Sequence, residues 1–303
     1  MLDGPHAPAQ EPPVVPPKAI AAAALIEAAA LLFKAAWGPL GTGAIQYRTS
    51  PSAVWLIAGT DLVNVALIVP LLVLGAALLL QGRLGGKYLL VLTPLTVYYS
   101  AFSVGFGLEW SNPVYAGNSE HFAGLFVLQV VMATAVLAGT LPLFTSADAH
   151  AFSQRGPRAY VMFMVAFLAL FALMWTGELL EVMAVGGTAG GAGGTAPTAF
   201  HLVHFIDLEI VIPLGALALY LLYTQPAQAY GLVLLFLGFF ATLGAAVTAV
   251  AALLVTHHAP GAEASAIVVF ATFSLLSWAT LLFTVRGNVP RPYRRRPTPA
   301  TAP

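Results

Sequence analysis

Six histidine and carboxylate side chains lie within or at the ends of long apolar segments of this sequence, at Asp61, Glu178, Glu181, His201, His204 and Asp207. Glu178 and Glu181 are three residues apart, a spacing that places both carboxylates on one face of a helix. His201, His204 and Asp207 also share a face, because at about 100° per residue they fall within an arc of roughly 120°. An ionised side chain inside a membrane is costly unless it meets a partner, a cavity or water. The spacing therefore predicts one functional cluster of imidazole and carboxylate groups.

The chemistry of this cluster is that of a metal site or of a proton relay. Imidazole and carboxylate ligands suit Zn²⁺, Mn²⁺, Fe²⁺ or Cu²⁺. We predict that His201, His204 and Asp207 bind such a divalent transition metal and leave a coordination position open, with Glu178 or Glu181 as the catalytic acid or base. The same groups suit proton transfer, because histidine titrates near neutral pH. The alternative without a function is that they form hydrogen bonds between helices and fix their packing.

Other cofactor classes fit the sequence less well. The chain has no cysteine, which excludes thiolate metal sites, Cys-ligated iron–sulfur clusters and covalently attached c-type haem. A b-type haem held by His201 or His204 is less favoured than a metal ion, because His121 is the only plausible second axial ligand.

Further polar residues accompany the cluster. Lys34 follows Glu27 by seven residues, which is two helical turns along one face. We expect Lys34 to form an ion pair, either with Glu27 or with a carboxylate on a neighbouring helix. Asn64 follows Asp61 by about one turn and points in the same direction. Glu120 ends a polar and aromatic loop that is expected to be either a lid over the site or an interfacial belt, with Glu120 capping the next helix.

The elements that position these residues are transmembrane helices. Hydrophobic residues make up 59% of the 303 positions and charged residues 8%, far fewer charges than a soluble domain carries. Long apolar windows occur at 19–40, 53–80, 88–108, 122–144, 160–185, 200–223, 230–256 and 266–285. We predict an all-α, polytopic transmembrane bundle of about eight spans over residues 19–286. A disordered tail, 1–18, and a basic, proline-rich tail, 287–303, flank it.

Basic residues predict how the bundle is oriented. All but two of the twelve lysines and arginines fall on one side of the eight-span arrangement, the exceptions being Lys34 and Arg48. By the positive-inside rule, both termini are cytoplasmic, and the protein is a multi-pass component of the inner (cytoplasmic) membrane. The arginines of the C-terminal tail are expected to bind anionic lipid rather than nucleic acid.

An internal repeat is suggested by a pattern that occurs twice. The order Asp-Leu, Pro-Leu, Tyr is found at Asp61, Pro70 and Tyr88, and again at Asp207, Pro213 and Tyr230. Residues 19–145 and 160–286 would then be two parallel four-helix repeats, with an aspartate at the same place in each.

Three functions fit this pattern. The favoured one is a metal-binding or redox membrane enzyme, an oxidoreductase, that acts on a lipid-soluble or external substrate. The second is an ion or proton-coupled transporter, in which the same residues bind an ion or relay protons. The third is an accessory subunit of a membrane complex, whose polar groups face a neighbouring subunit.

Overall fold

The computed structural model describes residues 15–105, 114–145, 147–149, 157–185, 197–260 and 262–286, and all regular structure within these ranges is helical. Eight helical stretches in the described ranges are long and apolar enough to cross a membrane. Their bounds differ from the predicted ones by four residues or fewer, the largest difference being that the third span begins at Leu84 rather than at residue 88. The prediction of an all-α polytopic bundle is therefore confirmed. Most of both predicted tails lies outside the described residues.

The N-terminal half, residues 15–149, contains four spans. These are α1 (Pro17–Trp37), then α2 (Pro51–Val63) with η1 (Asn64–Ile68) and α3 (Val69–Leu80), then η2 (Leu84–Gly86) with α4 (Lys87–Leu90) and α5 (Pro94–Gly105), and lastly η3 (Ser119–Phe122) with α6 (Ala123–Thr140) and η4 (Leu141–Leu143). Ser50 begins the second span, because its side chain accepts a hydrogen bond from the amide of Ala53 at 3.2 Å. The third span is interrupted just before Pro94, where proline starts a new helix.

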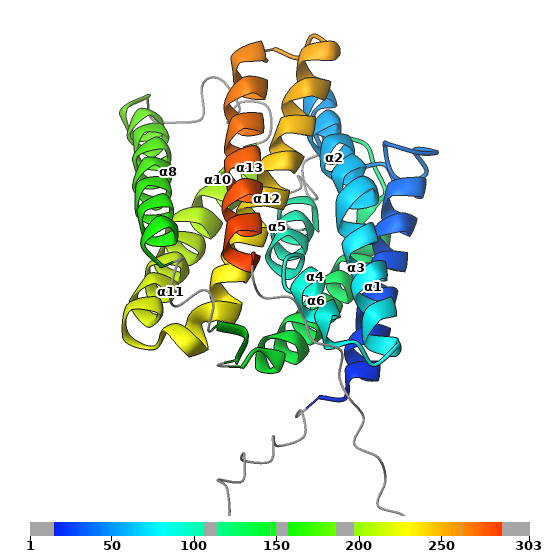
Figure 1. Ribbon diagram of the computed structural model, residues 1–303. Helices are drawn as coiled ribbons and strands as arrows, with labels where there is room; N and C mark the ends of the chain where they lie inside the picture. The colour runs from blue at the N-terminus through cyan, green and yellow to red at the C-terminus, as the bar shows by residue number, and fades with distance from the viewer. Residues whose placement is uncertain are drawn as a thin grey trace, which may run out of the picture.

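The C-terminal half, residues 157–286, contains the other four spans. These are α8 (Pro157–Val185), then α10 (Pro197–Phe205) with η5 (Ile206–Val211) and α11 (Ile212–Thr224), then α12 (Pro226–Thr256) and α13 (Ala264–Val285). Figure 1 shows α12 between the blue and cyan helices of the N-terminal half and the green helices α8 and α11. It packs against α2 and α5 of the first half as well as α11 and α13 of its own.

Two apolar cores lie beside this central helix. One gathers aromatic residues of α12, including Tyr230, Phe239 and Phe240, and the other joins α1, α3 and α6 through residues such as Leu31 and Leu72. Gly59 lets α2 approach α12 closely, since a Cβ atom at this position would lie 2.6 Å from the Cα atom of Val250. Apolar side chains on the outward faces of α8 and α13 are exposed, as the lipid-facing surface of a membrane protein requires.

The chain crosses the bundle an even number of times, so residues 17 and 286 lie at the same end. The described basic residues Lys18, Arg83, Lys87, Arg158 and Arg286 also lie at this basic end. Residues 38–50, 114–118, 257–260 and 262–263 lie at the opposite, distal end. That the basic end faces the cytoplasm is still a prediction.

Candidate functional site

Both aspartates of the suspected repeat lie next to a π-helical turn. Asp61 is three residues before η1, and Asp207 is the second residue of η5. In each case the next α-helix carries proline as its second residue, Pro70 in α3 and Pro213 in α11. Proline lacks an amide hydrogen and its ring clashes with the carbonyl four residues earlier, and a widened π turn accommodates both effects. Both halves therefore have a π turn between the aspartate region and the proline, although Asp61 precedes its turn and Asp207 lies inside it.

Asp61 belongs to a buried ion pair. The Nζ atom of Lys34 on α1 lies 2.9 Å from Oδ1 of Asp61, and both side chains are fully buried. Asn64 lies beside the same carboxylate. The expectation that Lys34 pairs with a carboxylate on a neighbouring helix is confirmed, and the partner is on α2.

Asp207 is equally buried but has a different environment. The hydroxyl group of Tyr99 on α5 donates a hydrogen bond to Oδ2 at 3.3 Å, and the indole of Trp175 on α8 lies within hydrogen-bonding reach of the carboxylate. Over the described ranges, no lysine or arginine forms an ion pair with Asp207.

His204 on α10 and Glu178 on α8 lie close to one another. The Nε2 atom of His204 lies 4.0 Å from Oε2 of Glu178, whose side chain is 42% exposed, whereas that of His204 is 5% exposed. The rings of Trp175 and His204 are in edge-on contact, with 4.3 Å between their centroids. Glu178, His204 and Asp207 are thus a series of ionisable groups of decreasing exposure, and Trp175 lies beside both His204 and Asp207.

The other predicted site residues do not complete a cluster with this series, although the charge of Glu181 lies near that of Glu178. Glu181 and His201 are exposed, and Asp61 is in the other half of the bundle. In the part of the chain that the structure describes, no three histidine or carboxylate side chains are grouped so that they could hold a metal ion. The six residues are separated because α2 packs on α12 whereas α10 packs on α5. In addition, Asp207 lies in a π turn, so the angular spacing of an α-helix does not apply to it.

A contact between the two halves involves a pair of threonines. The Oγ1 atoms of Thr96 on α5 and Thr242 on α12 are 2.5 Å apart and fully or nearly fully buried. Their separation in sequence, 242 − 96 = 146, equals that of the two aspartates, 207 − 61 = 146. This contact was not predicted, because a threonine in an apolar helix gives no signal of its own.

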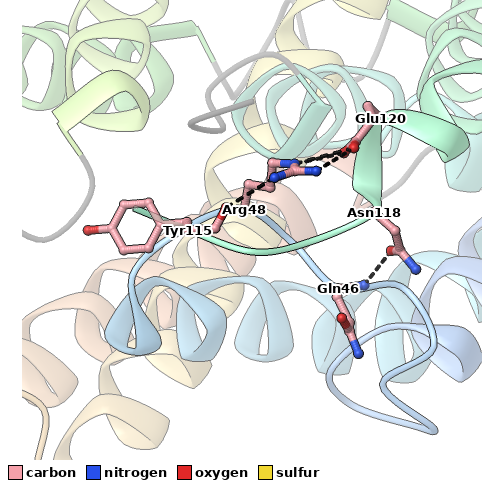
Figure 2. A network of polar contacts seen from close by, with 5 residues as sticks. All are labelled: Gln46, Arg48, Tyr115, Asn118 and Glu120. Atoms are coloured by element: carbon pink, nitrogen blue, oxygen red, sulfur yellow. Dashed lines mark hydrogen bonds and ion pairs between the residues drawn. The ribbon is translucent and has the colours of Figure 1, made fainter. Parts of the chain in front are cut away.

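Glu120 contributes to a network at the distal end, which Figure 2 shows. The guanidinium group of Arg48 donates hydrogen bonds to both carboxylate oxygens of Glu120, the shortest at 2.8 Å, and to the carbonyl of Tyr115 at 3.2 Å. The side-chain oxygen of Asn118 accepts a hydrogen bond from the backbone amide of Gln46 at 2.8 Å. The hydrogen bond to Glu120 raises the pKa of Arg48 above its ordinary value. The network ties the described part of the loop to the segment that follows α1.

Lys34 and Arg48, which the sequence places away from the other basic residues, are both paired. Each of them forms an ion pair with a carboxylate, Lys34 with Asp61 and Arg48 with Glu120.

A third ion pair lies at the basic end. Lys87 is nearly buried, and its Nζ atom donates hydrogen bonds to Asp148 at 2.7 Å and to the carbonyl of Leu143 at 2.8 Å. Tyr88 and Thr145 also donate to Asp148. Burial raises the pKa of Asp148, but these hydrogen bonds outweigh it and lower the pKa below its ordinary value. The sequence marked Lys87 only as a basic residue of the flanking loop.

The two buried aspartates are therefore suited to different chemistry. The charge of Asp61 is already compensated by Lys34, whereas Asp207 is held by neutral donors and can take up a proton or a cation. No protein-family model, no curated protein and no solved structure matches this chain.

Proposed function

We propose that this protein is a membrane transporter that relays protons across the membrane, and that Asp207 takes up and releases the proton. The observation that carries the proposal is the burial of Asp207 without a cationic partner among the described residues. An ionised carboxylate in such a setting is costly, so the group is stable only while it holds a proton or a cation. A structural role would be better served by the arrangement at Asp61, where the charge is compensated.

Glu178 and His204 supply a route for the proton. Glu178 is accessible at its carboxylate, and His204 lies behind it at 4.0 Å. Histidine changes its protonation state near neutral pH, which suits it to pass protons between an accessible carboxylate and a buried one. Trp175 contacts His204 and lies beside Asp207, so the two residues share a neighbour.

The backbone supports a transport function as well. Many transporters consist of two structural repeats and place their ion sites in helices interrupted near the middle of the membrane. Here, η1 and η5 interrupt the second and sixth spans, each close to an aspartate. In π turns, which are frequent at functional sites, the backbone departs from the regular α-helical ladder.

Proton movement into liposomes tests the proposal. The purified protein is reconstituted into liposomes that contain a pH-sensitive dye, and a potassium gradient with valinomycin drives protons inward. We expect faster acidification than in empty liposomes and a loss of at least tenfold in Asp207→Asn. Glu209→Gln is the matched control, because Glu209 lies in the same π turn but is exposed. Acidification at the wild-type rate in Asp207→Asn, or no acidification above that of empty liposomes, would contradict the proposal.

The metal-binding or redox enzyme and the accessory subunit are still predictions. The described residues lend no support to a metal at His201, His204 and Asp207, since His201 is exposed and no ligand group of three is formed. Elemental analysis and a visible absorption spectrum of the purified protein test for a transition metal or a b-type haem. Partners that copurify in stoichiometric amounts would support the subunit role.

A further inference from the structure

Tyr99 links Asp207 to the other half of the bundle. Its hydroxyl donates a hydrogen bond to Oδ2 of Asp207 at 3.3 Å, and Tyr99 lies on α5 in the N-terminal half. Its ring lies beside that of Phe239 on α12, with 6.0 Å between the centroids. Trp175, which also lies within reach of the carboxylate, belongs to the same half as Asp207. Asp207 is therefore contacted from both halves, although it lies in only one of them.

The contact of α5 with α12 determines where Tyr99 lies. Thr96 and Thr242 meet through their hydroxyl oxygens about one helical turn before Tyr99. Leu92, in the turn before α5, packs closely on Gly238, since a Cβ atom there would lie 2.5 Å from the Cα atom of Leu92. Each of these contacts joins residues that are 146 positions apart in the sequence, so the two helices run in register. An approach this close leaves α5 little freedom to slide along α12.

The positions that correspond to Tyr99 and Asp207, 146 residues away, carry different groups. Ala245 on α12 follows Tyr99 by 146 positions and has no hydroxyl group to donate. Asp61, which precedes Asp207 by 146 positions, is paired with Lys34 at 2.9 Å. A cation beside a carboxylate holds it in its ionised form, whereas a neutral hydroxyl group favours that form more weakly. The neutral donor suits an aspartate that loses and regains a proton.

Few titratable groups in the described ranges surround Asp207. His204 precedes it on the same span, Glu178 lies beside His204 on α8, and Glu181 and Glu209 are exposed. The helices α5, α11 and α12 contain no aspartate, glutamate, histidine, lysine or arginine. Apart from Tyr99, their tyrosines are Tyr98, which faces α6, and three near the basic end, Tyr220, Tyr223 and Tyr230. Tyr99 is thus the titratable side chain that these three helices bring to Asp207.

We propose that Tyr99 is a positioning residue that sets the pH at which Asp207 loses its proton. The inference rests on the proposed function, in which Asp207 takes up and releases a proton. A hydrogen bond donated to a carboxylate stabilises its ionised form, so without the hydroxyl of Tyr99 the proton is held to a higher pH. Because Tyr99 belongs to the N-terminal half, the packing of the two halves against each other determines how readily the proton leaves.

Infrared difference spectra of the full chain in lipid, recorded against pH, test this inference. The Asp207 band is the band of a protonated carboxyl group that is present in the wild type and absent from Asp207→Asn. In Tyr99→Phe the midpoint of this band should rise by about 1 pH unit, the effect of one hydrogen bond to a charged group. Tyr98→Phe is the matched control, because the hydroxyl of Tyr98 donates to Thr134 instead, at 2.7 Å. It should leave the midpoint unchanged.

A second variant tests whether the packing of the halves acts through Tyr99. Gly238→Ala places a Cβ atom against the backbone of Leu92 and so displaces α5 from α12, which should shift the midpoint of the Asp207 band. The same substitution should cause no further shift in the Tyr99→Phe background. Gly124→Ala is the matched control, because a Cβ atom at Gly124 meets nothing within 4 Å. A shift in Gly238→Ala that persists without the hydroxyl of Tyr99 would contradict this coupling.

The outcomes separate this inference from the proposed function. An unchanged midpoint in folded Tyr99→Phe would overturn the inference, even if liposomes acidify through Asp207. If Tyr99→Phe does not fold, 3-fluorotyrosine is incorporated into the wild-type chain, where it makes each hydroxyl a stronger donor and should lower the midpoint; an unchanged or raised midpoint would overturn the inference. Liposomes that do not acidify would contradict the proposed function alone, because the infrared midpoint does not depend on net proton movement. The lack of any Asp207 band would overturn both.

Discussion

The two halves of the bundle contain similar backbone elements but differ in whether their carboxylates pair with lysine or arginine. Asp61 and Asp207 each lie ten residues after the proline that begins their span, Pro51 and Pro197, and each lies next to a π turn. In the described part of the N-terminal half, three carboxylates pair with lysine or arginine, and over the described residues of the C-terminal half none does. In the proposed function, similar local structures serve stability in one half and proton binding in the other.

The largest effect is expected at the fully buried pair. Lys34→Met should lower the free energy of unfolding by about 3–5 kcal/mol, because it leaves the Asp61 carboxylate buried without its counter-charge. Chemical or thermal unfolding in detergent measures this loss, and a low yield of folded protein would agree with it.

The double variant Lys34→Met/Asp61→Leu is the control for that loss. It removes both charges and should regain most of the stability, because a buried ion pair can be replaced by apolar residues at little cost. A single variant that is as stable as the wild type would show that Asp61 does not need compensation, and the contrast with Asp207 would disappear.

A smaller effect is expected at the partly exposed pair of Lys87 and Asp148. Asp148→Asn should cost about 1–2 kcal/mol, since it weakens hydrogen bonds to a charged group that solvent partly screens. The pKa of Asp148 is lowered in the folded state, so its contribution is present above the pKa of the unfolded chain and is lost as the pH falls below about 4. The unfolding midpoint of the wild type, measured against pH, should therefore fall more steeply in acid than that of Asp148→Asn. Parallel curves would contradict this assignment.

The smallest effect is expected at the pair of Arg48 and Glu120, the most exposed of the three lysine or arginine pairs described. Arg48→Gln should lower the unfolding midpoint only slightly, because exposed ion pairs contribute little to stability and salt screens them. Comparing the variant with the wild type in low and in high salt checks this: the small difference should vanish in high salt. A difference that is large and unaffected by salt would mean that the network holds the distal loops by more than charge.

Much of the fold could be predicted from the sequence. Long apolar windows define helix bounds well, because a helix that crosses a membrane must keep its polar backbone groups bonded internally over a fixed length. The pairing of Lys34 could also be expected, because a buried lysine requires a counter-charge. The repeated order of aspartate and proline indicated two related elements, and the π turns at η1 and η5 are consistent with them.

The composition of the site could not be predicted to the same extent. The spacing of residues along one helix predicts which of them share a face, but not which helices pack against that face. Asp61 was therefore grouped with His204, although α2 and α10 pack on different helices. Tyr99 and Trp175, which contact Asp207, are aromatic residues in apolar segments and give no signal in the sequence. The π turn at Asp207 also changes the angular spacing on which the predicted metal site depended.

Infrared difference spectroscopy of the carboxyl groups tests most directly whether Asp207, and not Asp61, exchanges a proton. Spectra of the purified protein in lipid are recorded between alkaline and acid pH, for the wild type and for the variants Asp207→Asn and Asp61→Asn. We expect a band of a buried, protonated carboxyl group that changes with pH in the wild type and in folded Asp61→Asn, and that is absent from Asp207→Asn. A band that survives in Asp207→Asn and disappears only in Asp61→Asn would contradict the assignment of the proton to Asp207.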